Sequence, residues 1–259
     1  MKSICSIIKK TWLIALFFTF VWLAKINVSI AAINVATAAN MKETAKVLAK
    51  EFFKKYAIKV NIISGASGNL YQQIINGAPF EVFISADTNY PNNILKNNYN
   101  ANQPKIYAYG KLVIVVSNKD VTINNIYDIN SKNIQHIAIA NPKVAPYGKE
   151  AINILKKYNL DKQLKDKIVY APSINAVNEL TFSKAVDIAF TSKSALVLHS
   201  DNTIRYYEVP TNLYNLIPQA VVLIKTSNKE KAKEAELFFN FMFSKAGSKI
   251  LENSGYIVK

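Results

Sequence analysis

Hydrophobic and polar residues follow two periods along this chain, which predicts strands and helices in alternation. Short aliphatic runs such as VNII at 60–63 have the length and composition of buried strands, whereas apolar residues between 40 and 56 recur every three or four positions, as on an amphipathic helix. Alternating elements of this kind are typical of an α/β fold with mostly parallel sheets flanked by helices. Strands are predicted at 33–36, 60–63, 82–85, 111–116, 137–140, 168–170, 186–190 and 220–224, and helices at 40–56, 69–75, 149–158, 176–183 and 229–244.

The first 31 residues do not follow this pattern. Lysines come first, an apolar run at 12–24 follows, and Ser-Ile-Ala at 29–31 ends the segment. Basic, apolar and small-x-small regions in this order are typical of a secretory signal peptide. The apolar run is short for a membrane-spanning helix, the structure that a retained anchor would need. We therefore expect 1–31 to be a signal peptide cleaved after Ala31, and the mature protein to be periplasmic.

The position of the cysteine and the distribution of charge exclude several classes of function. The only cysteine, Cys5, lies in the predicted signal peptide, so the mature chain would have no disulfide, thiolate metal site or cysteine nucleophile. The formal net charge is +15, but all basic residues except Arg205 are lysines, and they are scattered singly. Because nucleic-acid binding usually needs a clustered basic surface, we expect no nucleic-acid partner.

Four predicted strand-to-helix turns carry small residues and neutral hydrogen-bond donors. In open α/β sheets, ligands bind at the carboxyl ends of the strands, where these turns lie. The first N–H groups of each following helix are unpaired and partly positive, so several helix ends meeting at one point can bind an anion without Lys or Arg. Ordinary helix capping, with Asn40 as one N-cap, is the alternative for each turn taken singly. The four turns are TAAN at 37–40, SGASGN at 64–69, NPKVAPYG at 141–148 and APSINA at 171–176.

The catalytic interpretations are weaker. GASG at 65–68 lacks the Gly-x-Ser-x-Gly spacing of a nucleophile elbow, and a serine hydrolase also needs a histidine base. The chain has only His136, at the start of a predicted strand, and His199, in a predicted surface loop. Two histidines and no mature cysteine also disfavour a transition-metal site. We interpret Asp87 as a strand-end residue that holds the adjacent turns, and expect neither enzymatic activity nor a cofactor.

Several motifs, in their order along the chain, resemble the periplasmic molybdate-binding proteins of ABC importers. They are VATAANMKETAKVLAKEF, SGASGNLYQQIINGAPFEVFISAD, NPKVAPYGKEAI, APSINAVNEL and the terminal GYIVK. The resemblance covers 33–259 and implies a two-lobed type II periplasmic binding protein with two hinge-crossing strands. Lobe 1 would comprise 32–112 plus 221–259, and lobe 2 would comprise 113–220. The resemblance also implies a monomer that delivers molybdate or tungstate to a membrane permease.

The resemblance also implies which residues hold the oxyanion. Asn40 would donate from its side-chain amide or its backbone, and Ser67 from its hydroxyl and N–H. Tyr147 and Ala176 would each donate a backbone N–H. These groups are all neutral, and none of them requires a bound metal cation.

Phe190 departs from the family pattern. It stands where some members have a tyrosine whose hydroxyl reaches the anion, and a phenylalanine has no hydrogen to donate. The site would therefore either make one bond fewer or take a donor from elsewhere, for which Thr191 and Tyr147 are candidates.

Three rival functions stay open at this point. The first is a binding protein for another tetrahedral oxyanion, namely sulfate, thiosulfate or phosphate, although a phosphate site would need an acceptor for the ligand's O–H. The second is a secreted serine hydrolase that uses Ser67. The third is the ligand-sensing domain of a regulator, which the signal peptide and the absence of a DNA-binding segment disfavour. The sequence does not distinguish molybdate from tungstate.

Overall fold

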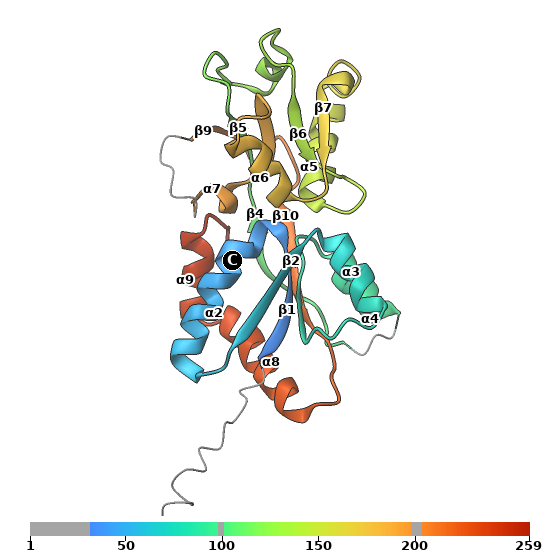
Figure 1. Cartoon of the computed structure of the whole chain (residues 1–259), viewed down its shortest axis with the longest axis vertical. Helices are drawn as coiled ribbons and strands as arrows, with labels where there is room; N and C mark the ends of the chain where they lie inside the picture. Colours follow the sequence, from blue (N-terminus) through green and yellow to red (C-terminus); the bar gives the residue numbers. More distant parts are fainter. Residues whose placement is uncertain (1–31, 98–100, 198–203) are drawn as a thin grey trace, which may run out of the picture. The chain divides into compact units, whose positions relative to one another are not determined.

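The computed structural model describes residues 32–97, 101–197 and 204–259 (Figure 1). The predicted signal peptide, including Cys5, and His199 lie outside these residues. Within the described ranges, no helix is both long and apolar enough to cross a membrane. Residues Ala32–Lys259 form one compact unit, which contains two sheets.

The first sheet has five strands in the order β2-β1-β3-β10-β4. β1 pairs in parallel with β2 and β3, whereas β10 is antiparallel to both β3 and β4. The sheet is therefore mixed, with its parallel part formed by the first three strands of the chain. The strands are β1 (Ile33–Ala38), β2 (Val60–Gly65), β3 (Val82–Ile84), β4 (Lys105–Gly110) and β10 (Ile217–Leu223).

Helices cover both faces of the first sheet (Figure 1). On one face, Phe52 packs edge-on against Phe238 with ring centroids 5.1 Å apart, beside the aliphatic residues of β1. On the other face, Leu70 and Ile74 pack against Phe83. Burial of these apolar side chains is the main force that holds the helices to the sheet. The first face carries α2 (Lys42–Tyr56), α8 (Lys229–Met242) and α9 (Lys245–Asn253), and the second carries α3 (Ser67–Ile75) and α4 (Asn89–Lys96).

The second sheet repeats this arrangement, in the order β7-β6-β8-β5-β9. β6 is parallel to β7 and β8, and β5 is antiparallel to β8 and β9. Together the two sheets and their helices confirm the predicted α/β fold class. The prediction of mostly parallel sheets is wrong, because β5 and β10, the strands that follow the crossings between the sheets, run antiparallel to both of their neighbours. The elements of the second sheet are β5 (Leu112–Val116), β6 (Ile137–Ala140), β7 (Ile168–Ala171), β8 (Ile188–Ser192) and β9 (Arg205–Glu208), with α5 (Pro146–Lys157), α6 (Ile174–Phe182), α7 (Lys193–Val197) and the short 3-10 turns η2 (Ile126–Asn130) and η3 (Lys165–Lys167). A further 3-10 turn, η1 (Ala39–Met41), joins β1 to α2 beside the first sheet.

The chain passes between the sheets twice. β4 ends at Gly110 and β5 begins at Leu112, so the first crossing is a single residue. The second crossing joins the end of β9 to the start of β10. The N–H of Leu112 donates to the hydroxyl of Tyr214 at 3.0 Å, which ties the two crossing segments together.

Several elements are absent from the sequence-based prediction: α4, β4, α7, β9 and α9. The α4 segment, NYPNNILK, is rich in turn-forming residues, and its proline is tolerated because it lies in the first helical turn. The predicted long helix at 229–244 ends at Met242 instead. Ser244 accepts a hydrogen bond from the N–H of Gly247 and thereby caps a new helix.

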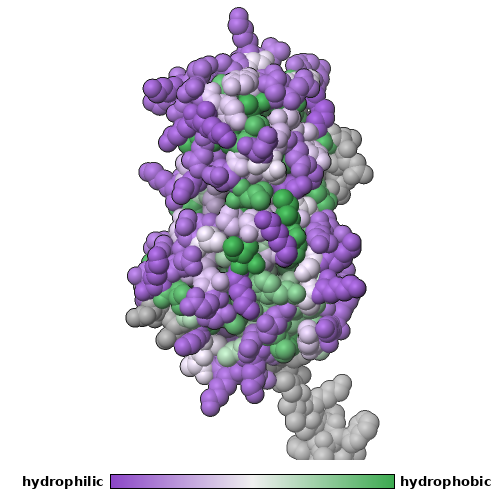
Figure 2. All heavy atoms as spheres, turned by 180° about the vertical axis from the view of Figure 1, so that it is seen from behind, coloured by the Kyte–Doolittle hydropathy of each residue, from purple (hydrophilic) through white to green (hydrophobic). Residues whose placement is uncertain are grey.

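The surface agrees with the scattered lysines of the sequence. The face shown in Figure 2 is mostly hydrophilic, with apolar side chains gathered toward its middle. The large apolar side chains that are exposed come from separate elements, for example Phe53 of α2, Ile106 of β4 and Tyr170 of β7. Such single exposed apolar residues are normal for a folded domain.

Asp187→Asn is expected to lower the free energy of unfolding at neutral pH by about 1 kcal/mol, a reduced value for hydrogen bonds to a partly exposed charge. The Asp187 carboxylate accepts from the N–H of Gln135 at 2.8 Å, the N–H of His136 at 2.9 Å and the Asn118 amide at 2.8 Å. Burial acts to raise the pKa of Asp187, but these hydrogen bonds outweigh it and lower the pKa.

The stabilisation by Asp187 is therefore present above its unfolded pKa and is lost as the pH falls through the lower folded value. Urea unfolding of wild type and Asp187→Asn should show a difference at pH 7 that shrinks as the pH falls below about 4. The exposed Asp120 offers a matched control, since Asp120→Asn should have little effect at either pH. A difference independent of pH would contradict the role given to the charge.

Candidate functional site

A small cavity of about 10 Å³ lies where the carboxyl ends of strands from both sheets meet. Parallel strands bring their turns to one edge: Ala38 pairs with Gly65 in the first sheet, and Ala140 pairs with Ala171 in the second. None of the residues that line this cavity is charged. They are Ala38, Ala39, Asn40, Ala66, Ser67, Ala86, Ala145, Pro146, Tyr147 and Ile174.

The structure brings together three of the residues that the sequence predicts for the site, namely Asn40, Ser67 and Tyr147. Ala176 does not line the cavity; its N–H donates to the hydroxyl of Ser173 at 3.3 Å. Phe190 does not line it either, because its side chain lies in the core of the second sheet and is 1% exposed.

The prediction that Asn40 caps the following helix is wrong. Asn40 lies inside the 3-10 turn η1, and α2 has no side-chain cap. The Asn40 amide instead donates to Oε1 of Gln219 at 3.0 Å and to the hydroxyl of Tyr256 at 2.9 Å. Because an amide NH₂ has two hydrogens, both of its donors have partners, and the backbone N–H is the group of Asn40 left for a ligand.

Ser67 is the first residue of α3, and its hydroxyl is buried at the cavity wall. Its oxygen accepts a hydrogen bond from the N–H of Ala86 at 3.1 Å, so the turns after β2 and β3 are linked through it. An oxygen that accepts still carries its own hydrogen, which remains available for donation. The backbone N–H of Ser67 belongs to the first helical turn and has no partner within the helix.

Tyr147 is the second residue of α5 and follows Pro146, which is well suited to the first position of a helix. The N–H of Tyr147 therefore also lacks a partner within the helix. Its hydroxyl accepts from Nε2 of Gln219 at 2.8 Å. Burial raises the pKa of the Tyr147 hydroxyl well above its ordinary value, so the phenol is neutral. Its ring thus connects a backbone donor at the cavity to a hydrogen bond with the first sheet.

The other residues singled out from the sequence have structural contacts. Asp87 accepts from the Ser85 hydroxyl at 2.9 Å and the Tyr90 N–H at 3.2 Å, which confirms that it holds the turn after β3. Burial raises the pKa of Asp87. The hydroxyl of Thr191 donates to Oδ1 of Asn178 at 2.6 Å, so its hydrogen is already used.

Hydrogen bonds join the turns of the two sheets around the cavity. The N–H of Gly68 donates to the carbonyl of Val144 at 2.9 Å. A Cβ on Gly68 would lie 3.0 Å from the Val144 Cα, so glycine permits this close approach. The Asn175 amide adds a bond to the Ser64 hydroxyl at 3.3 Å. These contacts join the Gly-rich turn after β2 to turns of the second sheet.

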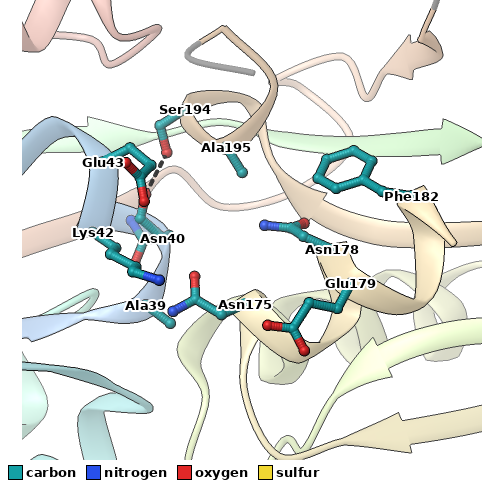
Figure 3. Close-up of a pocket in the computed structure, with 10 residues that line it drawn as sticks. All are labelled: Ala39, Asn40, Lys42, Glu43, Asn175, Asn178, Glu179, Phe182, Ser194 and Ala195. Atoms are coloured by element: carbon teal, nitrogen blue, oxygen red, sulfur yellow. Dashed lines mark hydrogen bonds between the residues drawn. The ribbon is translucent and has the colours of Figure 1, made fainter. Parts of the chain in front are cut away.

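A larger pocket of about 310 Å³ adjoins the cavity and shares Ala39 and Asn40 with it (Figure 3). Here the Ser194 hydroxyl donates to the carbonyl of Asn40 at 2.9 Å. Unlike the small cavity, this pocket has charged walls, and it is lined by Ala39, Asn40, Lys42, Glu43, Asn175, Asn178, Glu179, Phe182, Ser194 and Ala195.

The described residues do not bring together groups for metal or hydrolytic chemistry. In the ranges described, no three residues among His, Cys, Asp and Glu are grouped so as to hold a metal ion. His136 is exposed just before the amino end of β6, whereas Ser67 faces the cavity at the carboxyl ends of the strands. His136 is therefore not placed to act as a base for Ser67.

Comparison with known proteins gives the class of protein first. Residues 33–257 match the family of bacterial extracellular solute-binding proteins, and the chain belongs to this family. Within it, the chain is 32% identical over 225 residues to the molybdate-binding protein ModA of Rhodobacter capsulatus, covering 86% of this chain and 87% of that protein.

A solved structure supports the same placement. The periplasmic molybdate-binding protein of Azotobacter vinelandii matches with a TM-score of 0.81 and 32% identity, over 88% of this chain and 99% of that one. The resemblance to molybdate-binding proteins that the sequence motifs indicated is confirmed.

Proposed function

We propose that this protein is the extracytoplasmic solute-binding component of an ABC importer and that it captures molybdate or tungstate in the small cavity. The observation that carries the proposal is the lining of this cavity: turns from both sheets meet there with neutral groups alone. The names of two relatives that are each 32% identical, both molybdate-binding proteins, support the choice of ligand.

Neutral donors suffice for a dianion if several of them act together. An unpaired buried charge would be prohibitive, but charge-assisted hydrogen bonds and helix N-termini replace the lost hydration. We propose that the donors are the Ser67 hydroxyl and the backbone N–H groups of Asn40, Ser67 and Tyr147. The N–H of Ala176 joins them only when the anion displaces the Ser173 hydroxyl that it now contacts.

The same donors provide selectivity. A protonated oxyanion such as hydrogen phosphate carries an O–H that needs an acceptor, and an unmet buried donor costs about 1–3 kcal/mol. The nearest carboxylate along the chain, that of Asp87, accepts from Ser85 and Tyr90 and does not line the cavity. A fully ionised anion is therefore preferred.

For the lobes we propose 32–110 plus 217–259 and 112–208, with hinges at the two crossings between the sheets. These bounds differ slightly from the predicted 32–112 plus 221–259 and 113–220, because β10 belongs wholly to the first sheet and β5 to the second. Entry of the ligand requires the turns of the two lobes to separate, and closure around it gives the form that the permease recognises. In this proposal the protein acts as a monomer in the periplasm, after removal of the signal peptide, and has no enzymatic activity and no cofactor.

One observation favours a second candidate. A cavity of about 10 Å³ has room for about one water molecule, so the turns must move apart for any tetrahedral oxyanion to enter. Sulfate, the second candidate, is smaller than molybdate, so its binding needs less movement of the turns.

Thermal unfolding of the mature protein with molybdate, tungstate, sulfate and phosphate added separately tests the proposal. At 1,000-fold over Kd a ligand adds about 4 kcal/mol, which raises the Tm of a protein of this size by about 8–16 °C. We expect this shift with molybdate and tungstate alone. A Tm shift with sulfate or phosphate alone would identify that anion as the ligand instead of molybdate. The absence of a shift with every oxyanion would refute the anion site.

A further inference from the structure

Gln219 lies behind the cavity and contacts a cavity residue from each sheet. It belongs to β10, is fully buried, and does not line the cavity itself. Its Oε1 accepts from the Asn40 amide at 3.0 Å, and its Nε2 donates to the Tyr147 hydroxyl at 2.8 Å. The hydroxyl of Tyr107 also donates to Oε1, at 2.7 Å. One carboxamide therefore bridges the turn after β1 and the helix after β6.

The bridge is located at the crossing between the sheets. A Cβ on Gly110, the last residue of β4, would lie 2.0 Å from the Tyr147 hydroxyl oxygen and 2.2 Å from Nε2 of Gln219. These two groups thus occupy the space that any other residue at 110 would fill. β10 also changes register against β4 between Gln219 and Ala220. Such a bulge re-aims the neighbouring side chains of a strand.

Asn40 is fixed from several directions at once. Besides the bond to Gln219, its amide donates to the Tyr256 hydroxyl, and its carbonyl accepts from that hydroxyl at 3.2 Å and from Ser194 at 2.9 Å. The side chain of Asn40 therefore holds the backbone of its own turn in place. The position of the Asn40 backbone N–H, one of the proposed donors, is set by this network.

We propose that Gln219 is a positioning residue that sets the distance between the Asn40 and Tyr147 donors, and with it the size of oxyanion that the site accepts. This inference rests on the proposed function. It also gives the Tyr147 hydroxyl a role. This hydroxyl lies next to Gln219 and Gly110, so it does not replace the tyrosine hydroxyl that is missing at Phe190. Gln219 acts through its two neighbours and does not contact the anion.

Titration calorimetry and stopped-flow dissociation with molybdate and sulfate test this on wild type, Gln219→Met, Tyr147→Phe and the double variant. Each single change removes the link between Gln219 and Tyr147 and leaves all backbone donors. We expect each to weaken molybdate binding by about 10- to 100-fold, the range for residues that orient ligand groups from outside. The double variant should bind little more weakly than Gln219→Met, because Gln219→Met already removes the link that Tyr147→Phe removes, together with the bonds to Asn40 and Tyr107.

Selectivity separates positioning from mere stability. If Gln219 sets the spacing of the donors, both variants should lose molybdate affinity more than sulfate affinity. Glu81→Gln is the control: it weakens the buried contacts of Glu81 with the Asn34 N–H and Lys231, which lie just before the amino end of β3, and Glu81 does not line the cavity or contact Asn40, Tyr147 or Gln219. It should lower the Tm and leave the affinity and the selectivity unchanged.

Three results would overturn the inference. Wild-type affinity in Gln219→Met would do so, as would equal losses for both oxyanions that match those in Glu81→Gln. Additive effects in the double variant would show that the two residues act separately. If the wild-type protein binds no oxyanion, both the proposed function and this inference are wrong. The wild-type titration alone shows this, so that outcome is distinguishable from a failure of the inference only.

Discussion

Ser67→Asp is expected to abolish molybdate binding while the protein stays folded. A carboxylate in place of the Ser67 hydroxyl would face a dianion inside the cavity. Two unit charges 4 Å apart interact with about 4 kcal/mol at an effective dielectric constant of 20, which alone corresponds to about a 1,000-fold loss. The fold should tolerate the change, since an acidic residue at the first position of α3 is favourable at a helix N-terminus.

Ser67→Ala separates the repulsion from the lost hydrogen bond. It should weaken binding by about 1.5–3 kcal/mol, the range for a hydrogen bond to a charged group. Titration calorimetry gives both affinities, and circular dichroism with thermal unfolding checks the fold. Wild-type affinity in Ser67→Ala would remove Ser67 from the site, and molybdate binding by Ser67→Asp would show that the anion lies elsewhere.

Gly148→Ala is expected to cause a large loss of stability together with a loss of affinity. A Cβ on Gly148 would lie 1.8 Å from the carbonyl oxygen of Ala140 and 2.7 Å from its carbonyl carbon. These are backbone atoms at the end of β6, so the first turn of α5 would have to move, and the neighbouring Tyr147 N–H with it. Alanine usually favours a helix over glycine by about 1 kcal/mol, but overpacking of this severity costs typically 1–3 kcal/mol or more.

Gly65→Ala provides the matched control for this change. A Cβ at that position would meet only the Leu70 side chain, at an ordinary contact distance of 3.5 Å. Urea unfolding should therefore give a lower free energy of unfolding for Gly148→Ala and an unchanged or slightly higher one for Gly65→Ala. Equal stability of the two variants would mean that α5 does not approach β6 as closely as described.

The candidate site shows which structural features can be predicted from the sequence. The small residues of the turns indicated where the site lies, the resemblance to molybdate-binding proteins implied Ser67 and Tyr147 within those turns, and the structure places both at the cavity. The orientation of the Asn40 side-chain amide could not be predicted from the sequence. Its partners, Gln219 and Tyr256, are 179 and 216 residues away along the chain. Gln219 itself carries no local signal, because it is one polar residue in an otherwise apolar strand.

The sequence by itself determined the alternation of strands and helices, the α/β class and the neutral character of the turns, because hydrophobic period and turn chemistry depend on neighbouring residues. Only the tertiary structure decided which of the predicted residues line the cavity. Ala176 contacts Ser173, Phe190 packs in a core, and Asn40 is anchored by residues from the C-terminal part of the chain. The physical reason is that a buried polar group must find partners, and the fold alone determines which partners are within reach.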